Sequence, residues 1–190
     1  MAPRTALAAL ALAAAAALPA AAEVELAFYF GPQDAHPSTL DVSDPAGIGD
    51  VTLDATWEGL PFDSPPHYGL RATWWRSDSF GWHVDFNHTK VYADDATLTT
   101  YGLTRLEMTD GLNNITLGGT WRWPGAWGPV TPYVGVGAGI AVPHFQWDAG
   151  AGMTSGYQYA GPSAAAMAGV SYEINQDWSL FAEGKITHSW

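Results

Sequence analysis

The sequence predicts an all-β protein, a small antiparallel transmembrane β-barrel of the eight-stranded type. The first observation is period-two alternation, as in the segment 24–30, where every second residue is apolar. The second is composition, because only 14% of the 190 residues are charged, against about 25% in soluble domains. The third is that seven of the ten tryptophans flank short connections, as the aromatic girdle of a membrane barrel would. These are Trp74, Trp75, Trp82, Trp121, Trp123, Trp127 and Trp178.

The first 22 residues have the layout of a secretory signal peptide. Arg4 supplies a positive charge, a run of Ala and Leu follows at 6–18, and the small residues 20–22 form a cleavage site. The apolar run is shorter than the ~20 residues that a membrane-spanning helix needs. We therefore expect export of the chain, with the barrel domain at 23–190.

Seven segments of alternating polarity follow the signal peptide. They are 24–30, 67–76, 80–91, 112–123, 131–142, 158–174 and 178–190. Short connections at 77–79, 124–130 and 175–177 alternate with long ones at 31–66, 92–111 and 143–157. Because bacterial barrels have short periplasmic turns and long outer loops, we expect the long connections outside the cell. A soluble β-sandwich or a lipocalin-like barrel would alternate in the same way and remains an alternative.

The short connection at 77–79 predicts a strand register. If paired residue numbers sum to 156, Trp74 lies opposite Trp82 on the lipid-facing side, and Arg71 lies opposite Asp85 on the other. A slip by one residue would move every side chain to the wrong face, so both faces support this register. The connection at 175–177 predicts in the same way that Tyr172 pairs with Leu180.

The number of spans is odd, which is unusual for this class. Single-chain bacterial barrels have an even number of strands, eight at minimum, so we expect that the final C-terminal strand is lacking. An alternative count makes 51–58 an eighth strand, since its residues alternate as well. That count would place a long loop on the periplasmic side. We therefore interpret 51–58 as a β-extension of the outer loop 31–66.

The polar face of the predicted spans carries a set of charged and titratable residues. An eight-stranded barrel has room inside for side chains but not for a wide pore. We expect opposite charges to neutralise one another there, and a proton or ion path is the alternative function. The expected lumen charge network consists of Arg71, His83, Asp85, Arg122, Glu183 and Lys185.

The first outer loop is rich in carboxylates, which suit Ca²⁺, Mg²⁺ or Mn²⁺. Asp44, Asp50 and Glu58 are candidate ligands of a divalent cation, and Glu58, His36 and Asp50 are candidate catalytic residues. A solvated acidic loop is the simpler interpretation. His88 and Lys90 lie near the outer end of their strand, where they could meet a lipid headgroup.

Several classes of function are excluded. A net charge of −12 with only seven Lys and Arg argues against nucleic-acid binding. The absence of cysteine excludes a disulfide scaffold and a cysteine nucleophile. The stretch 135–139 resembles part of a dinucleotide loop, but it lies inside a strand, and no site for an organic cofactor is recognisable.

Several stretches resemble the outer-membrane lipid A oxidase-like proteins of alphaproteobacteria, a family of small outer-membrane barrels. They are 36–39, 44–50, 57–59, 65–75 and 85–93, with HPST, DPAGIGD, WEG, PPHYGLRATWW and DFNHTKVYA as their sequences. The resemblance implies oxidation of the proximal glucosamine of lipid A to an aminogluconate unit, with dioxygen and a divalent cation. It assigns no catalytic residue. It also implies location in the outer membrane of a Gram-negative cell, and family members continue into a final strand.

Two functions follow from these expectations. The favoured one is an oxidoreductase that acts on lipid A at the outer leaflet. The alternative is a non-enzymatic structural or adhesion barrel of the small porin-like type. In both cases we expect the partners to be outer-membrane lipid, lipopolysaccharide and the export and barrel-assembly machinery, with the protein a monomer. A narrow channel is a third hypothesis.

Overall fold

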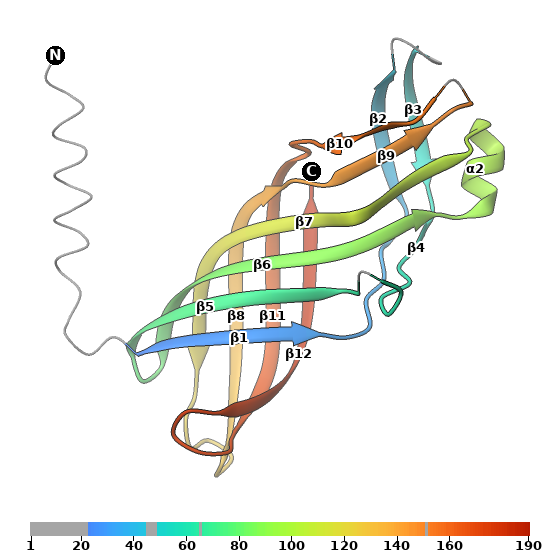
Figure 1. Cartoon of the computed structure of the whole chain (residues 1–190). Coiled ribbons are helices and arrows are strands. Elements are labelled where there is room, and N and C mark those ends of the chain that lie inside the picture. Colours follow the sequence, from blue (N-terminus) through green and yellow to red (C-terminus); the bar gives the residue numbers. More distant parts are fainter. Residues whose placement is uncertain (1–22, 45–48, 65, 151) are drawn as a thin grey trace, which may run out of the picture.

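A curled antiparallel sheet organises the computed structural model, which describes residues 23–44, 49–64, 66–150 and 152–190. Seven strands pair in the order β1-β5-β6-β7-β8-β11-β12 and form a half-barrel, with β8, β11 and β12 behind β1, β5 and β6 (Figure 1). Their bounds are β1 Val24–Phe30, β5 Tyr68–Ser77, β6 Phe80–Ala93, β7 Arg105–Arg122, β8 Val130–Ala141, β11 Gly161–Glu173 and β12 Ser179–Ser189. The fold is therefore all-β, as predicted, and the expected signal peptide at 1–22 lies outside the described residues.

Both predicted registers are confirmed. Trp74 pairs with Trp82 and Arg71 with Asp85 across the turn between β5 and β6. Tyr172 likewise pairs with Leu180 between β11 and β12. A short turn leaves little freedom in register, so the polarity of the two faces decides it.

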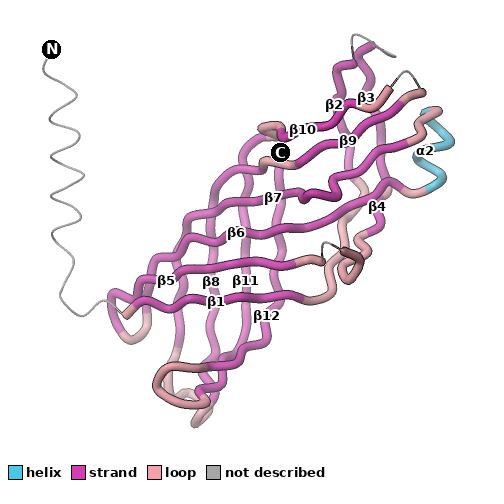
Figure 2. The backbone as a smooth tube through the Cα atoms, in the orientation of Figure 1, coloured by secondary structure: helices cyan, strands magenta, loops and turns pink. Residues whose placement is uncertain are grey.

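A second part of the molecule extends beyond the wall of the half-barrel (Figure 2). It contains the hairpin β2 Ser38–Asp44 and β3 Gly49–Ala55, the short strand β4 Trp57–Glu58, the helix α2 Asp95–Tyr101, and the strands β9 His144–Asp148 and β10 Thr154–Tyr157. β6 and β7 run on into this extension, where β4 pairs with β6 and β9 pairs with β7. Most of residues 51–58 thus lie in β3 and β4, outside the seven-strand order of the wall. The expected long connections at 92–111 and 143–157 also contain regular structure, namely α2, the start of β7, β9 and β10. We call this part the extension.

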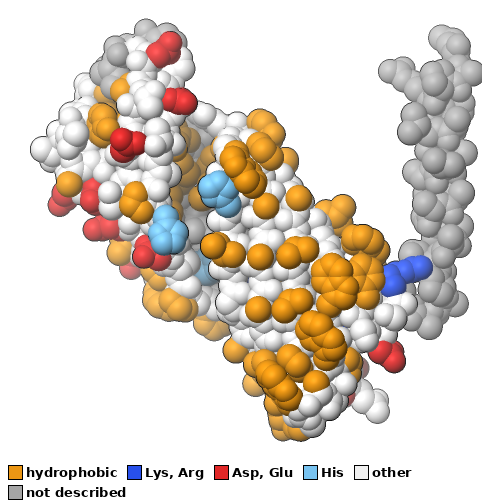
Figure 3. Space-filling view, turned by 180° about the vertical axis from the view of Figure 1, so that it is seen from behind, with side chains coloured by type: hydrophobic (Ala, Val, Ile, Leu, Met, Phe, Trp, Pro, Cys, Tyr) orange, Lys and Arg blue, Asp and Glu red, His pale blue; other side chains and the backbone are white. Residues whose placement is uncertain are grey.

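The wall of the half-barrel is apolar on its outer face. Leu26 is 79% exposed, Leu117 62% and Ile186 66%, and each belongs to the alternating set that points away from the interior. Hydrophobic side chains are spread over the wall, whereas acidic side chains gather on the extension (Figure 3). The described residues contain no helix that is long and apolar enough to cross a membrane.

The extension has the opposite polarity, because its apolar residues are buried in a core of its own. Leu53 of β3 is fully buried there, together with Leu106 of β7 and Trp147 of β9. Segments that are far apart in the sequence supply this core, so the extension is a folded unit and not a loose loop. Its members are Leu53, Ala55, Trp57, Val91, Ala93, Leu103, Leu106, Met108 and Trp147.

One tryptophan of the predicted girdle faces the interior. Trp74 is 36% exposed on the outer face, but its neighbour Trp75 is only 6% exposed, because successive residues of a strand point to opposite faces. The Trp75 indole N–H donates a hydrogen bond to Glu25 Oε2 at 3.0 Å. The guanidinium of Arg122 lies 3.7 Å from its ring centroid. Trp75 therefore anchors the turn end of the interior.

Helix α2 should respond to pH through its N-cap, Asp94. The Thr97 hydroxyl and backbone N–H hold the pKa of Asp94 below its ordinary value, and the N–H donates to Asp94 Oδ1 at 2.8 Å. Because its folded-state pKa is lowered, ionised Asp94 stabilises the helix at pH values above its unfolded-state pKa. This stabilisation is lost as the pH falls through the folded-state pKa. The protection factors of the α2 amides in hydrogen exchange, which are corrected for the intrinsic rate, should therefore fall below about pH 4. Asp94→Asn keeps the cap without the titration, so an equal loss of protection in that variant would contradict the assignment.

Candidate functional site

Four charged side chains meet inside the half-barrel. Arg71 of β5 donates to Asp85 Oδ2 at 3.0 Å from Nε. Its two other guanidinium nitrogens donate to both carboxylate oxygens of Glu183 on β12, each at 2.7 Å. Lys185, also on β12, donates to Asp85 Oδ1. Two cations and two carboxylates thus form one buried, electrically balanced cluster, and these four members of the predicted network lie together.

Two tyrosines complete this cluster, and neither of them was predicted as a member of the lumen charge network. The Tyr29 hydroxyl donates to Asp85 Oδ1 at 3.0 Å and accepts from Lys185 Nζ at 2.7 Å. The Tyr133 hydroxyl donates to Glu183 Oε2 at 2.9 Å. The signal for Tyr29 was its place in the polar set of β1, opposite Gly69. A Cβ at Gly69 would lie 1.9 Å from Tyr29 Cζ, so the glycine leaves room for the ring.

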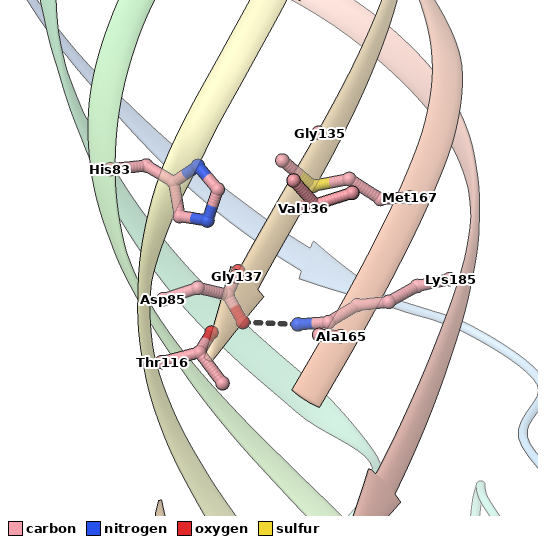
Figure 4. A pocket seen from close by; sticks show the side chains of 9 residues that line it. All are labelled: His83, Asp85, Thr116, Gly135, Val136, Gly137, Ala165, Met167 and Lys185. Atoms are coloured by element: carbon pink, nitrogen blue, oxygen red, sulfur yellow. Dashed lines mark hydrogen bonds and ion pairs between the residues drawn. The ribbon is translucent and has the colours of Figure 1, made fainter. Parts of the chain in front are cut away.

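A small cavity adjoins the charged cluster (Figure 4). It has a volume of about 10 Å³, with His83, Asp85, Thr116 and Lys185 among its lining residues. Space of this size holds about one water molecule. His83 is turned toward Thr120, with its Nδ1 2.8 Å from the hydroxyl oxygen. This site therefore suits electrostatic stabilisation of the fold, and it has no room for an organic substrate.

Arg122 is part of a different group. Its guanidinium lies 3.2 Å from Glu23 Oε2 and 3.7 Å from Glu25 Oε2, at the end of the wall where the short turns lie. The predicted lumen charge network is thus divided in two. The division arises because alternation predicts which face of the sheet a residue occupies, but it does not predict which residues of distant strands lie at the same level along the barrel axis.

The candidate catalytic and metal residues of the first outer loop are spread along the β2–β3 hairpin. Asp50 lies near the closed end of the hairpin and accepts a hydrogen bond from Ser43 Oγ at 2.6 Å. His36 precedes the first residue of β2, and Glu58 lies in β4, opposite Tyr92. At ~3.3 Å per residue, Asp50 and Glu58 lie at opposite ends of an extended segment.

Asp44 pairs with Gly49 through its backbone, and its side chain lies outside the described residues. Within the part of the chain that the structure describes, no three His, Asp or Glu side chains converge as a metal site. The predicted ligands therefore do not fit one cation site in this arrangement, and no catalytic step can be derived through them.

Lys90 also differs from its expected position at the headgroup level. It is fully buried, and its ammonium donates to the Asp63 carbonyl oxygen at 2.7 Å and to the Tyr92 hydroxyl at 3.1 Å. It therefore holds the loop 59–63 against β6.

A larger cavity opens on the outer face, at the level where the wall meets the extension. Its volume is about 450 Å³. His88 was expected near a headgroup, but this site could not be predicted from the sequence, because its walls come from four separate strands and one connecting segment. The lining residues are Tyr68, Phe86, His88, Asp110, Asn113, Ile115, Val142 and Tyr157. We call this cavity the outer groove.

Comparisons of the chain with protein-family models, with curated proteins and with solved structures found no match.

Proposed function

We propose that the chain is an outer-membrane β-barrel whose wall faces lipid and whose extension lies outside the cell. The observation that carries this proposal is the outer face of the wall, where each of the seven wall strands exposes at least one large apolar side chain. On β11, where alanines predominate, this side chain is Tyr172. In water such a surface would be an aggregation liability, whereas in a bilayer it is matched by the acyl chains. The buried polar cluster inside fits the same assignment.

The barrel is of the eight-stranded size class in this proposal. Side chains of β12 reach those of β1, β5 and β6 across the interior, since Lys185 contacts Tyr29 and Glu183 contacts Arg71. Such contacts require a diameter that side chains can fill, which is typical of the smallest barrels. A conducting pore is disfavoured by the same packing.

The activity that we propose is oxidation of the proximal glucosamine of lipid A to aminogluconate. The substrate is a proximal sugar with a free anomeric hydroxyl, whose C1 loses two electrons and two protons to dioxygen and becomes a lactone, while dioxygen becomes hydrogen peroxide. Water then opens the lactone to the acid, so the product gains one oxygen atom in total. The resemblance of residues 36–93 supports this reaction class, and the placement of a groove on the outer face supports access from the outer leaflet. The divalent cation that the resemblance implies has no ligand set among the described residues.

Mass spectrometry of lipid A tests the activity. Gram-negative cells that express the full chain under aeration should contain lipid A heavier by one oxygen atom, located on the proximal sugar. The same cells without oxygen should lack the product. Unmodified lipid A in aerated cells with the folded protein in their outer membrane would refute the proposed oxidation.

A structural or adhesion barrel is the second candidate function, and the extension is the observation that favours it. A folded unit with its own core can present a stable surface outside the cell. In this case alanine at Asp50 and Glu58, both exposed, should leave lipid A unchanged but weaken surface binding or envelope integrity. Altered lipid A in that double variant would favour the enzyme instead.

A further inference from the structure

The outer groove is formed by an irregularity between β6 and β7. Thr89 pairs with Leu112 and Val91 pairs with Met108, so Lys90 of β6 faces three residues of β7, 109–111. A bulge of this kind bends the strand pair and redirects side chains, and bulges are frequent at barrel rims and next to functional sites. Here it carries Asp110 to the edge of the groove.

Gly111 makes this arrangement possible. Its φ is +104°, and a Cβ on it would lie 2.3 Å from His88 Nδ1. Any other residue would therefore strain the bulge and push the imidazole of His88 aside. The position of His88 against the groove is thus built into the backbone.

Among the described residues, the His88 imidazole has a hydrogen-bond partner at Nδ1 but none at Nε2. Its Nδ1 lies 2.9 Å from Asn113 Oδ1, and its ring stacks on Tyr68 with the centroids 4.8 Å apart. The side chain is only 6% exposed, yet Nε2 has no hydrogen-bond partner among the described residues. A buried unpaired nitrogen costs free energy unless a ligand or water satisfies it. His88 therefore points to a ligand in the groove.

The rest of the groove has two chemically distinct halves. Asp110 and Tyr157 lie on the polar side, where Asp110 Oδ2 is 3.2 Å from His144 Nδ1. Phe86 and Ile115 belong to the lipid-facing set of the wall and form the apolar side. Carboxylate, imidazole, amide and phenol groups suit the hydroxyl and amide groups of a sugar. The Asp110 carboxylate disfavours a phosphate at the same position.

We propose that the outer groove binds the sugar of an acylated saccharide from the outer leaflet. A sugar hydroxyl or amide pairs with His88 Nε2 and the Asp110 carboxylate, while an acyl chain lies along Phe86 and Ile115. With lipid A as this saccharide, the inference rests on the proposed function and locates its binding site. Binding itself involves no chemical step.

Titration of the full chain in phosphatidylcholine nanodiscs with lipid A, followed by native mass spectrometry, tests the site. His88→Phe keeps the stacking on Tyr68 but removes Nε2, and we expect at least about tenfold weaker binding. The matched control is His188→Phe, at an exposed outward position near the end of β12, which should bind as the unchanged protein does. Ile115→Trp, at a half-exposed position, fills the apolar half and should weaken binding without altering a polar group.

The ligand is varied in the same experiment. Phosphatidylethanolamine should not compete with lipid A, and the deacylated sugar should compete about tenfold less well than lipid A. Equal binding by His88→Phe and Ile115→Trp, both folded by circular dichroism, would overturn the site. Equal competition by phosphatidylethanolamine would overturn recognition of the sugar.

The outcomes also separate this inference from the proposed function. A protein that binds lipid A through His88 but never oxidises it refutes the oxidase and retains the site. Normal oxidation by folded His88→Phe with unchanged binding refutes the site and retains the oxidase.

Discussion

Replacing Arg71 by methionine should lower the free energy of unfolding by about 3–5 kcal/mol, because removing one partner of a buried ion pair leaves a charge uncompensated. Arg71 is 7% exposed and holds Glu183 through two hydrogen bonds and Asp85 through a third. Among the residues that the structure describes, only the Tyr133 hydroxyl would still donate a hydrogen bond to Glu183. Urea unfolding of the protein in lipid vesicles, followed by tryptophan fluorescence, measures the change.

Two further variants identify the cause of this loss. Arg76→Met removes an exposed arginine from the same strand and should change the free energy by less than about 0.5 kcal/mol. Adding Glu183→Leu to Arg71→Met removes the carboxylate that the first change leaves without its cation. The double variant should therefore lose less free energy of unfolding than the sum of the losses in the two single variants. Additive losses would show that the two side chains are not coupled.

Leu53→Ala should destabilise the extension by about 2–5 kcal/mol, the usual cost of such a cavity in a core. Leu53 is fully buried among residues from β4, β6, β7 and β9. Of the wall strands, only β6 and β7 supply buried members of this core, and they do so beyond the bulge at 109–111, so the loss should be local. Limited proteolysis in vesicles should then cleave within residues 38–58 while the wall strands stay protected.

The matched control for this prediction is Leu180→Ala. Leu180 is 66% exposed on the outer face of β12, and its truncation removes exposed apolar surface but opens no cavity in the extension. Proteolysis of the extension should stay at the level of the unchanged protein. Equal cleavage in Leu53→Ala and Leu180→Ala would contradict an independent core.

The positions of the seven wall strands and the two short-turn registers could be predicted from the sequence. Alternation determines which face a residue occupies, and a turn as short as 77–79 allows few registers, so Arg71 and Asp85 could be paired in advance. Contacts across the interior depend on how strongly the sheet curls, which no local pattern encodes. Tyr29 and Tyr133 were therefore missed, and the separation of Arg122 from the Arg71 cluster could not be predicted.

The candidate sites could be predicted less well, for a related reason. The carboxylates of the first outer loop are close in sequence, but an extended hairpin separates Asp50 from Glu58. The outer groove has the opposite property, since His88, Asp110 and Tyr157 are distant in sequence and meet only because of the bulge at 109–111. A bulge changes which residues of two strands lie opposite each other, and the residue pattern of one strand does not show that pairing.

The inward-facing side chains of β6 change from polar to apolar at this same bulge. Below it, the inward set contains His83 and Asp85 and the outward set contains Trp82 and Phe86. Above it, the inward set continues with apolar Val91, which is 2% exposed in the extension core. In the proposed membrane orientation, the apolar outward side chains of the wall would end near this bulge, and the acidic surface of the extension would begin above it. The bulge would then mark the depth of immersion, and with it the height of the outer groove above the bilayer midplane.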